Sequence, residues 1–273
     1  MITSKNSEVK YWGQIATKIV DGQDFDELLA EQYRRVHLNL IARWTNIAAG
    51  KVILKTDLFA EAQCPSRAFL GNIFKTNCKV IGIDICTKIT SQAKTTAAQY
   101  ASDSTEYVNC DVRQLPFTSN SFDLIVSDST LDHFHHKDEI ITALSEFSRV
   151  LKPDGTLIIT MDNKDNLTEP LFRLWISFGL APFFIGKTYS IKELKQALAR
   201  VGLRVMESTA IIHNPRFFTR TIVSLIRHIK LPLFDHWIRR GLVFLDGLEN
   251  RKMKYLTAQF IAVKATKPNK RLA

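Results

Sequence analysis

Three aspartates in the first half of the chain each close a short run that contains Val, Ile or Leu. They are Asp57, Asp84 and Asp111. In an open parallel sheet, ligands bind outside the carboxyl ends of the strands, so we expect these three side chains to line one crevice. A carboxylate that ends the second strand can accept two hydrogen bonds from a ribose diol. NAD-binding sheets use the same geometry, but no Gly-x-Gly-x-x-Gly motif accompanies it here, which argues against NAD.

Ionisable side chains gather in one stretch further along, Ser127-Asp-Ser-Thr-Leu-Asp-His-Phe-His-His136. Histidine titrates near neutral pH and can serve as a general base, and His133 is our candidate for that role. The alternative is that His133 only packs within the fold. The spacing of the histidines and aspartates is not that of a tight metal site, so we expect no bound metal.

The elements that position these residues follow from hydrophobic periodicity. Apolar runs at strand length recur within 51–57, 79–84, 107–111, 122–127 and 156–161. Apolar residues at helical spacing predict helices over 24–44 and 138–151, and Ser190 with Glu193 forms a capping box for a helix that stops at Gly202. Two later strands are expected over 203–212 and 256–265. This alternation predicts an α/β fold built on a parallel sheet.

Four sequence pieces together resemble a known family. They are Val80-Ile-Gly-Ile-Asp-Ile85, Asn109-Cys-Asp-Val112, Leu115-Pro-Phe-Thr-Ser-Asn-Ser-Phe-Asp-Leu-Ile-Val126 and Arg149-Val-Leu-Lys-Pro-Asp-Gly-Thr156. This series resembles the class I S-adenosylmethionine (SAM)-dependent methyltransferases, and most closely their type 11, small-molecule branch. The resemblance implies a Rossmann-like, seven-stranded, mostly parallel sheet with N-terminal helices and a helical insertion before the last strand. It also implies SAM as cofactor and methyl transfer as the reaction.

Residue roles follow from the same resemblance. Asp84 would hold the ribose, Asp111 would accept from the adenine amino group, and Val112 would pack on the ring. His133 would face the methyl group, as the base for an acceptor that must lose a proton. The expected cofactor-binding residues are Asp57, Glu61, Asp84, Ile85, Asp111, Val112, Ser127 and Asp128.

The loop after the first strand departs from the family pattern. The family has acidic-x-Gly-x-Gly-x-Gly there, whereas this chain has Asp57-Leu-Phe-Ala-Glu-Ala62, without glycine. Glycines permit turns with positive φ and close approach of backbone amides to a ligand. Either the loop holds SAM in another way, with Asp57 or Glu61 as partner of the methionine ammonium, or the fold has lost its cofactor. The second outcome would make the protein a non-catalytic binding or scaffold protein.

Composition and charge bound the remaining possibilities. The 273 residues are 45% hydrophobic and 23% charged, as in an ordinary globular protein. The start has no apolar signal-peptide region, no stretch reaches the ~18 apolar residues of a membrane span, and the four cysteines lack zinc-site spacing. We therefore expect a cytoplasmic protein with reduced thiols. The net charge of +10 lies entirely in residues 203–273.

Domain organisation is expected to be simple. Residues 1–50 would form a helical cover and 51–273 the methyltransferase domain, with a lid-like segment at 163–189 and a helical insertion at 213–255. The insertion is basic and amphipathic, so it is either a cap over the site or a surface for peripheral contact with an anionic membrane. Its aromatic residues follow the apolar face, which disfavours nucleic acid. We expect a small-molecule or lipid-like acceptor, and the oligomeric state stays open.

Overall fold

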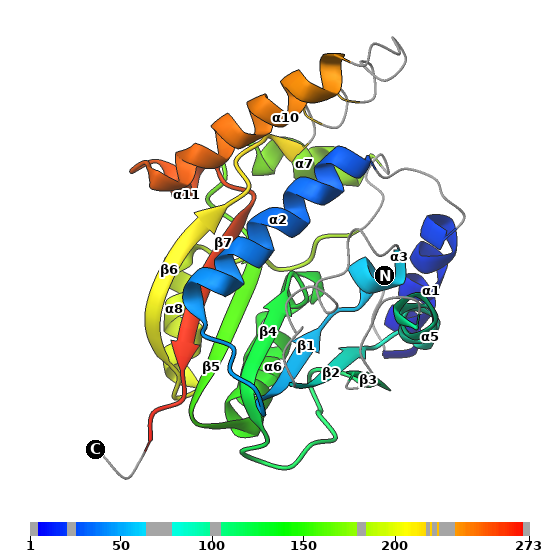
Figure 1. The fold of residues 1–273 in the computed structure, drawn as a ribbon, viewed down its shortest axis with the longest axis vertical. Helices are drawn as coiled ribbons and strands as arrows, with labels where there is room; N and C mark the ends of the chain where they lie inside the picture. The colour runs from blue at the N-terminus through cyan, green and yellow to red at the C-terminus, as the bar shows by residue number, and fades with distance from the viewer. Residues whose placement is uncertain are drawn as a thin grey trace.

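One seven-stranded sheet forms the centre of the protein (Figure 1). The computed structural model describes residues 5–20, 26–63, 78–98, 105–178, 184–216 and 233–269, with positions 219 and 223. Its strand order is β3-β2-β1-β4-β5-β7-β6, and β7 runs antiparallel to both of its neighbours. The strands are β1 (Val52–Thr56), β2 (Lys79–Asp84), β3 (Thr105–Asn109), β4 (Phe122–Asp128), β5 (Leu151–Asp162), β6 (Arg204–Ile211) and β7 (Phe260–Thr266). The predicted fold class is confirmed.

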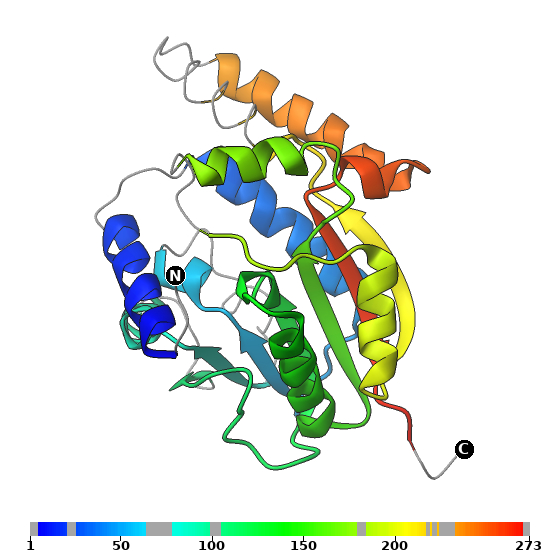
Figure 2. The same ribbon diagram turned by 180° about the vertical axis from the view of Figure 1, so that it is seen from behind.

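Helices cover both faces of this sheet (Figures 1 and 2). α6 (Lys137–Val150) and α8 (Ile191–Arg200) pack on one face, and α2 (Glu27–Trp44) and α5 (Thr87–Ala97) pack on the other. Successive strand residues alternate between two hydrophobic cores, because side chains of a strand point to opposite faces. In β1, for example, Ile53 lies in the core under α2 and Leu54 in the core under α6. The continuous apolar runs in the sequence therefore reflect a sheet that is buried on both faces.

Local sequence signals set the helix ends. The Asp26 side chain accepts hydrogen bonds from Leu28 N and Leu29 N and caps α2. The predicted capping box of Ser190 and Glu193 is present at the start of α8. The predicted helices over 24–44 and 138–151 are confirmed to within three residues at each end, since α2 and α6 span Glu27–Trp44 and Lys137–Val150.

The N-terminal helices and the later insertions surround the carboxyl ends of the strands. α1 (Lys5–Val20) lies beside α5, and the short α3 (Phe59–Gln63) follows β1 (Figure 1). η1 (Leu131–His133) lies between β4 and α6, and α7 (Glu169–Ser177) lies in the segment between β5 and α8. The insertion before β7 contains α10 (Leu233–Asp246), η2 (Gly247–Asn250) and α11 (Lys254–Thr257).

Part of the insertion falls outside the described residues, namely 217–218, 220–222 and 224–232. The amphipathic helix predicted there, with Arg220 and Arg227 on its basic side, therefore stays a prediction. Among the helices that the structure describes, none combines the length and the apolar character that a membrane span needs.

Candidate active site

The candidate site lies at the point where the order in which strands are added to the sheet reverses. After β1 the chain adds β2 and β3 on one side, and then returns to place β4 on the other side of β1. Such a switch point leaves a crevice at the carboxyl ends of the two central strands. Asp57 follows β1, while Ser127 and Asp128 end β4. The topology therefore brings these predicted site residues to one edge of the sheet.

The turn after β1 keeps a glycine-like backbone without glycine. Asp57 has φ = 66°, in the left-handed region. Aspartate tolerates this region better than most residues, because its short side chain can bond to nearby backbone. Here Asp57 Oδ1 accepts from Phe59 N at 2.7 Å. Asp57 thus supplies a positive φ, the property for which glycine is usually needed in such turns.

A buried ion pair lies directly beneath this turn. Lys55 Nζ is 3.1 Å from Glu61 Oε2, and each side chain is only 2% exposed. Lys55 also donates to the carbonyl of Asp57. Burial acts to lower the pKa of Lys55, but the charges of Glu61, Asp57 and Asp128 outweigh it and the pKa is raised. Glu61 is thus enclosed with Lys55, which leaves Asp57 as the better candidate for the methionine ammonium.

Sequence reasoning missed Lys55, although a signal was present. Lys55 stands two positions before Asp57, within the apolar run that was expected to form the first strand. A lysine inside a strand buried on both faces requires a buried partner, because an isolated charge is too costly there. That requirement pointed to Glu61 as a structural residue.

Asp84 already binds backbone amides with both of its oxygens. Oδ1 accepts from Cys86 N at 2.8 Å, and Oδ2 accepts from Leu58 N at 3.1 Å. Burial raises the pKa of Asp84 to about 6 although these hydrogen bonds lower it. Burial and the charge of Asp84 likewise raise the pKa of Asp57. Two carboxylates that repel each other in a crevice favour a ligand that carries hydroxyl donors and positive charge.

Asp111 lies within an ion-pair network that joins α1, α6 and the loop after β3. It is buried, and its oxygens accept from Arg113 Nε at 3.0 Å and from Arg113 Nη2 at 2.8 Å. Arg113 also binds Glu8 of α1 and Glu139 of α6. The Arg113 side chain is only 17% exposed.

The residues that directly follow Asp111 and Asp84 in the sequence differ in burial. Val112, predicted to pack on the adenine ring, belongs to the buried core on the α6 face. Ile85, directly after Asp84, is half-buried. Neither position is in conflict with the predicted role, and both roles stay predictions.

Three side chains contact the same oxygen of Asp128, two of them as hydrogen-bond donors. Its Oδ1 lies 2.9 Å from Tyr33 Oη, 2.8 Å from Thr160 Oγ1 and 3.0 Å from His37 Nε2. Burial acts to raise the pKa of Asp128, but His37, Lys55 and Thr160 lower it to about 2. Asp128 is therefore ionised at neutral pH. The neighbouring Ser127 is buried and accepts from Thr56 Oγ1 at 3.0 Å.

His133 lies between α1 and the segment that precedes α8. Its Nδ1 is 2.9 Å from the Phe184 carbonyl, and its ring meets the Trp12 ring edge-on, with 4.6 Å between centroids. A carbonyl can only accept, so Nδ1 carries the hydrogen, and the neutral ring has its lone pair on Nε2. Phe184 N donates to Tyr11 Oη at 2.6 Å. Tyr11 and Trp12, near the N-terminus, thus lie beside Phe184 and His133.

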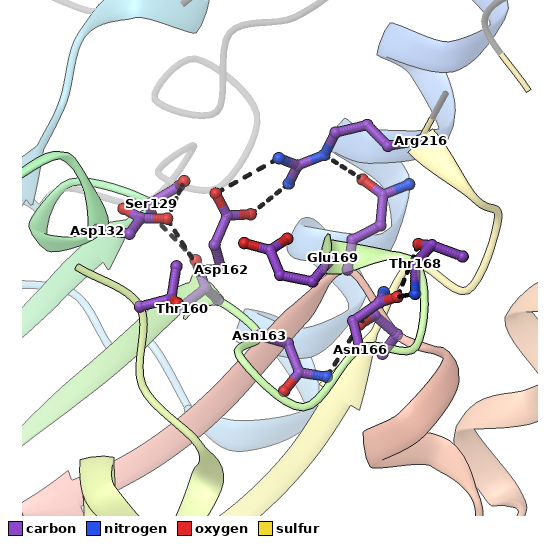
Figure 3. Close-up of polar contacts among 12 residues, drawn as sticks. Ser129, Asp132, Thr160, Asp162, Asn163, Asn166, Thr168, Glu169 and Arg216 are labelled. Atoms are coloured by element: carbon purple, nitrogen blue, oxygen red, sulfur yellow. Dashed lines mark hydrogen bonds and ion pairs between the residues drawn. The ribbon is translucent and has the colours of Figure 1, made fainter. Parts of the chain in front are cut away.

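A second group of charged side chains lies at the ends of β4 and β5 (Figure 3). It consists of Asp132, Asp162, Glu169 and Arg216. Arg216 binds the Asp162 carboxylate, and Glu169 forms an ion pair with Arg173 at 2.9 Å. The sequence marked Asp132 as ionisable, but it did not predict that these four side chains come together.

The residues of the crevice fit SAM. The half-buried carboxylates of Asp57 and Asp84 offer acceptors for an ammonium group and a ribose diol, and their mutual repulsion is relieved by a cationic ligand. SAM carries both an ammonium and a sulfonium charge. In contrast, no group of three His, Cys, Asp or Glu side chains in the described part of the chain is arranged to hold a metal ion.

Comparison with known proteins agrees with this assignment. Residues 61–159 match the family model described as "Methyltransferase domain". The chain is 34% identical over 104 residues to "Probable tRNA methyltransferase 9B" of Mus musculus, covering 36% of this chain and 22% of that protein. It is 37% identical over 98 residues to the ubiquinone/menaquinone biosynthesis C-methyltransferase of Bordetella parapertussis, covering 35% of this chain and 36% of that protein. The chain thus spans well under half of these relatives.

A solved structure extends the likeness beyond the matched segment. Phosphoethanolamine N-methyltransferase 2 of Haemonchus contortus, in complex with SAM, superposes with a TM-score of 0.58 at 18% identity, over 93% of this chain and 60% of that one. Sheet order and switch point define a Rossmann-like fold. Together with the match of residues 61–159 to the methyltransferase family model, this likeness supports a class I SAM-dependent methyltransferase whose cofactor is S-adenosyl-L-methionine.

Proposed function

We propose that this protein transfers a methyl group from SAM to a small-molecule or lipid-like acceptor. The main support for the proposal is a pair of half-buried carboxylates, Asp57 and Asp84, at the carboxyl ends of the adjacent strands β1 and β2. Asp57 lies in the turn after β1 and has a positive φ. SAM, when bound, supplies a methyl group on an electrophilic sulfonium. In this proposal Asp84 holds the ribose, Asp111 the adenine amino group and Asp57 the methionine ammonium.

Positioning is then the main task of the remaining side chains. Methyl transfer is an in-line displacement, and correct placement of the acceptor can supply much of the rate. Asp128 is fixed by Tyr33, Thr160 and His37 and stays ionised beside the crevice. His133, whose ring is held by the Phe184 carbonyl, is placed to take a proton through Nε2. These roles of Ser127, Asp128 and His133 belong to the proposal.

The experiment that tests this proposal is calorimetry of SAM and S-adenosylhomocysteine binding, with Asp111→Ala beside Asp165→Ala. Asp111 is buried in the crevice, whereas Asp165 is exposed in a turn after β5. We expect the wild type and Asp165→Ala to bind both nucleosides, and Asp111→Ala to lose about tenfold or more in affinity. Equal affinity of all three would contradict the adenine assignment, and no binding by a folded wild type would favour a non-catalytic protein.

The acceptor is proposed to be small because the polar groups that follow β4 and β5 are enclosed. Asp132 and Asp162 are 0% and 2% exposed, which suits a ligand that enters a confined site. The resemblance to a tRNA methyltransferase covers only 22% of that relative. Labelled methyl groups from SAM should therefore enter small molecules of a cell extract and not bulk tRNA. Label in tRNA would overturn this part of the proposal.

Exposed apolar and basic side chains at one end of the molecule favour a lipid-like acceptor, bound at an anionic membrane. Large apolar side chains are exposed on α7 and α10, which lie at the same end (Figures 1 and 2). They include Leu174 at 52%, Phe178 at 70%, Trp237 at 64% and Phe244 at 78% exposure. Residues 213–255 contain nine Lys and Arg against three Asp and Glu. Exposed apolar surface beside positive charge suits a membrane interface.

Vesicle co-sedimentation tests that contact. The protein should bind vesicles that contain phosphatidylglycerol more strongly than vesicles of phosphatidylcholine alone. Replacing Trp237 and Phe244 by Ser should abolish binding, whereas Met206→Ser, which changes an exposed residue of β6, should not. Absence of binding to anionic vesicles would remove the membrane contact and leave a free small-molecule acceptor.

A further inference from the structure

A buried carboxylate oxygen beside the crevice has no hydrogen-bond donor. Asp132 is 0% exposed. Its Oδ2 accepts from Ser129 Oγ at 2.8 Å and from Asp162 N at 2.8 Å. Its Oδ1 is enclosed and receives no hydrogen bond from any described residue. Buried polar atoms in folded proteins are almost always paired, so an oxygen left in this state points to a missing donor.

Two further carboxylates lie close to Asp132 (Figure 3). Asp162 ends β5 and lies between Asp132 and Glu169 in this view, and the Glu169 carboxylate points back toward Asp162. Burial and the charge of Asp162 raise the pKa of Asp132 to about 6. Burial and Asp162 also raise the pKa of Glu169. Asp162 therefore repels both Asp132 and Glu169, and an additional positive charge nearby is stabilising.

The two arginines of this region, Arg216 and Arg173, bind groups other than Asp132. The Arg216 guanidinium binds Asp162, donates to Gln259 Oε1 at 3.0 Å and lies over the rings of Phe172 and Phe260, 5.0 Å from each centroid. Arg173 pairs with Glu169 and is 42% exposed. Neither arginine donates to Asp132 Oδ1. Among the described residues, this group thus has three carboxylates and two guanidinium groups. The oxygen without a donor belongs to Asp132, which directly precedes His133.

We propose that Asp132, Asp162 and Glu169 form the acceptor subsite and that the acceptor is an amine, bound with an N–H directed at Asp132 Oδ1. This assignment rests on the proposed methyltransferase function. An amine brings an N–H donor for Asp132 Oδ1. Its nitrogen also gains positive charge during the reaction, which the neighbouring carboxylates stabilise. A hydroxyl or carbon acceptor would have to lose a proton first, and a carboxylate is too weak a base for that step.

The step balances without a further reactant. The amine enters largely as an ammonium ion, so one proton first passes to His133 Nε2 and on to water. The nitrogen lone pair of the resulting neutral amine then forms the N–C bond while the S–C bond breaks, and the electron pair of that bond stays on sulfur. Positive charge moves from sulfur to nitrogen, next to the carboxylates, which stabilise it in the transition state. The product is a methylammonium ion.

Matched pairs of acceptors test the assignment. The purified protein is incubated with SAM and with 2-phenylethylamine, ethanolamine or putrescine, each beside the alcohol of the same skeleton, and formation of S-adenosylhomocysteine is measured. SAM binding is measured by calorimetry in parallel. We expect turnover with amines and none with the alcohols. Asp132→Asn should lower turnover at least about 100-fold while SAM affinity stays within about twofold.

Two further variants keep the test decisive. Glu169→Gln should lower amine turnover about tenfold, and it provides a reading if Asp132→Asn fails to fold. Asp165→Asn, the same chemical change at an exposed position, should have no effect. SAM binding without turnover of any amine, turnover of alcohols instead, or full activity in both Asp132→Asn and Glu169→Gln would overturn the amine subsite. Failure to bind SAM would instead overturn the proposed function.

Discussion

The Lys55 ammonium and the Glu61 carboxylate meet 3.1 Å apart beneath the turn that opens the candidate cofactor site, and neither is more than 2% exposed. Lys55 lies in β1, a strand that is buried on both faces, so its charge requires a buried partner. Glu61 of α3 supplies the carboxylate that neutralises it. The pair therefore fixes α3 against β1 and shapes the loop that carries Asp57.

This ion pair should contribute strongly to stability when one partner is removed. Lys55→Met leaves Glu61 as an unpaired buried charge, and such changes cost about 3–5 kcal/mol of unfolding free energy. The double variant Lys55→Met, Glu61→Leu should be clearly more stable than Lys55→Met alone. Urea unfolding of the wild type, both single variants and the double variant gives the coupling energy. Strictly additive losses would contradict the pairing.

Asp132 should lower the stability of the protein at neutral pH. Its pKa is raised to about 6 in the folded state, so the folded protein holds this proton more tightly than the unfolded chain does. The corresponding stability is present in mild acid and is lost as pH rises through about 6. Asp132→Asn should therefore be more stable than the wild type at about pH 7.5, by about 1–3 kcal/mol, and the difference should vanish near pH 4.5.

Denaturant titrations at both pH values check this expectation. Asp138→Asn, at an exposed position in the first turn of α6, serves as control and should show no such pH dependence. An Asp132→Asn variant less stable than the wild type at neutral pH would show that this carboxylate is satisfied by the fold. The orphan oxygen would then give no reason to expect a ligand.

The Tyr33 hydroxyl should stabilise the ionised form of Asp128. It donates to a buried carboxylate at 2.9 Å, and hydrogen bonds to charged groups contribute about 1.5–3 kcal/mol. Tyr33→Phe should cost that amount at neutral pH. Asp128 has its pKa lowered to about 2, so the stability due to its charge is present above its ordinary pKa and is lost as pH falls toward about 2.

Chemical denaturation measures the cost of Tyr33→Phe. Tyr255→Phe is the matched control, because the Tyr255 hydroxyl makes only long contacts of 3.4 and 3.5 Å with Ser208. If both variants lost equally little, the Tyr33 hydroxyl would have no part in holding Asp128.

Gly186 marks the place where the segment before α8 closes on the loop after β4. A Cβ atom at this position would lie 2.0 Å from the Phe134 carbonyl oxygen. Gly186→Ala must therefore push the two loops apart and should cost about 1–3 kcal/mol. Gly241→Ala in α10, where a Cβ would have nothing within 4 Å, should instead stabilise by about 0.5–1 kcal/mol. Thermal unfolding compares the two, and an unchanged Gly186→Ala protein would contradict the close approach.

Much of the fold could be predicted from the sequence, because strand runs, helix periodicity and capping boxes are local signals. All seven strands were expected, and the capping box of Ser190 and Glu193 was found where the sequence put it. The aspartates at the carboxyl ends of the strands were also recognisable, since topology alone brings them to one edge.

The pairings within the site could not be predicted in this way. Arg216 and Asp162 are 54 residues apart in sequence, and Arg113 reaches Glu8 across 105 residues. Neither contact leaves a periodic trace, because an ion pair depends on where two distant elements are packed. Lys55 is the exception, because a lone cation inside a strand buried on both faces requires a buried partner on physical grounds alone.

Calorimetric titration of SAM into the wild type and into Asp84→Ala tests the central claim most directly. The claim is that the glycine-free loop retains a SAM site built on Asp84. We predict binding of SAM by the wild type, and a loss in Asp84→Ala of well over 1 kcal/mol, about tenfold or more in affinity, because charge-assisted hydrogen bonds to the ribose are removed. Equal affinity of Asp84→Ala and the wild type, with both proteins folded, would contradict the assignment.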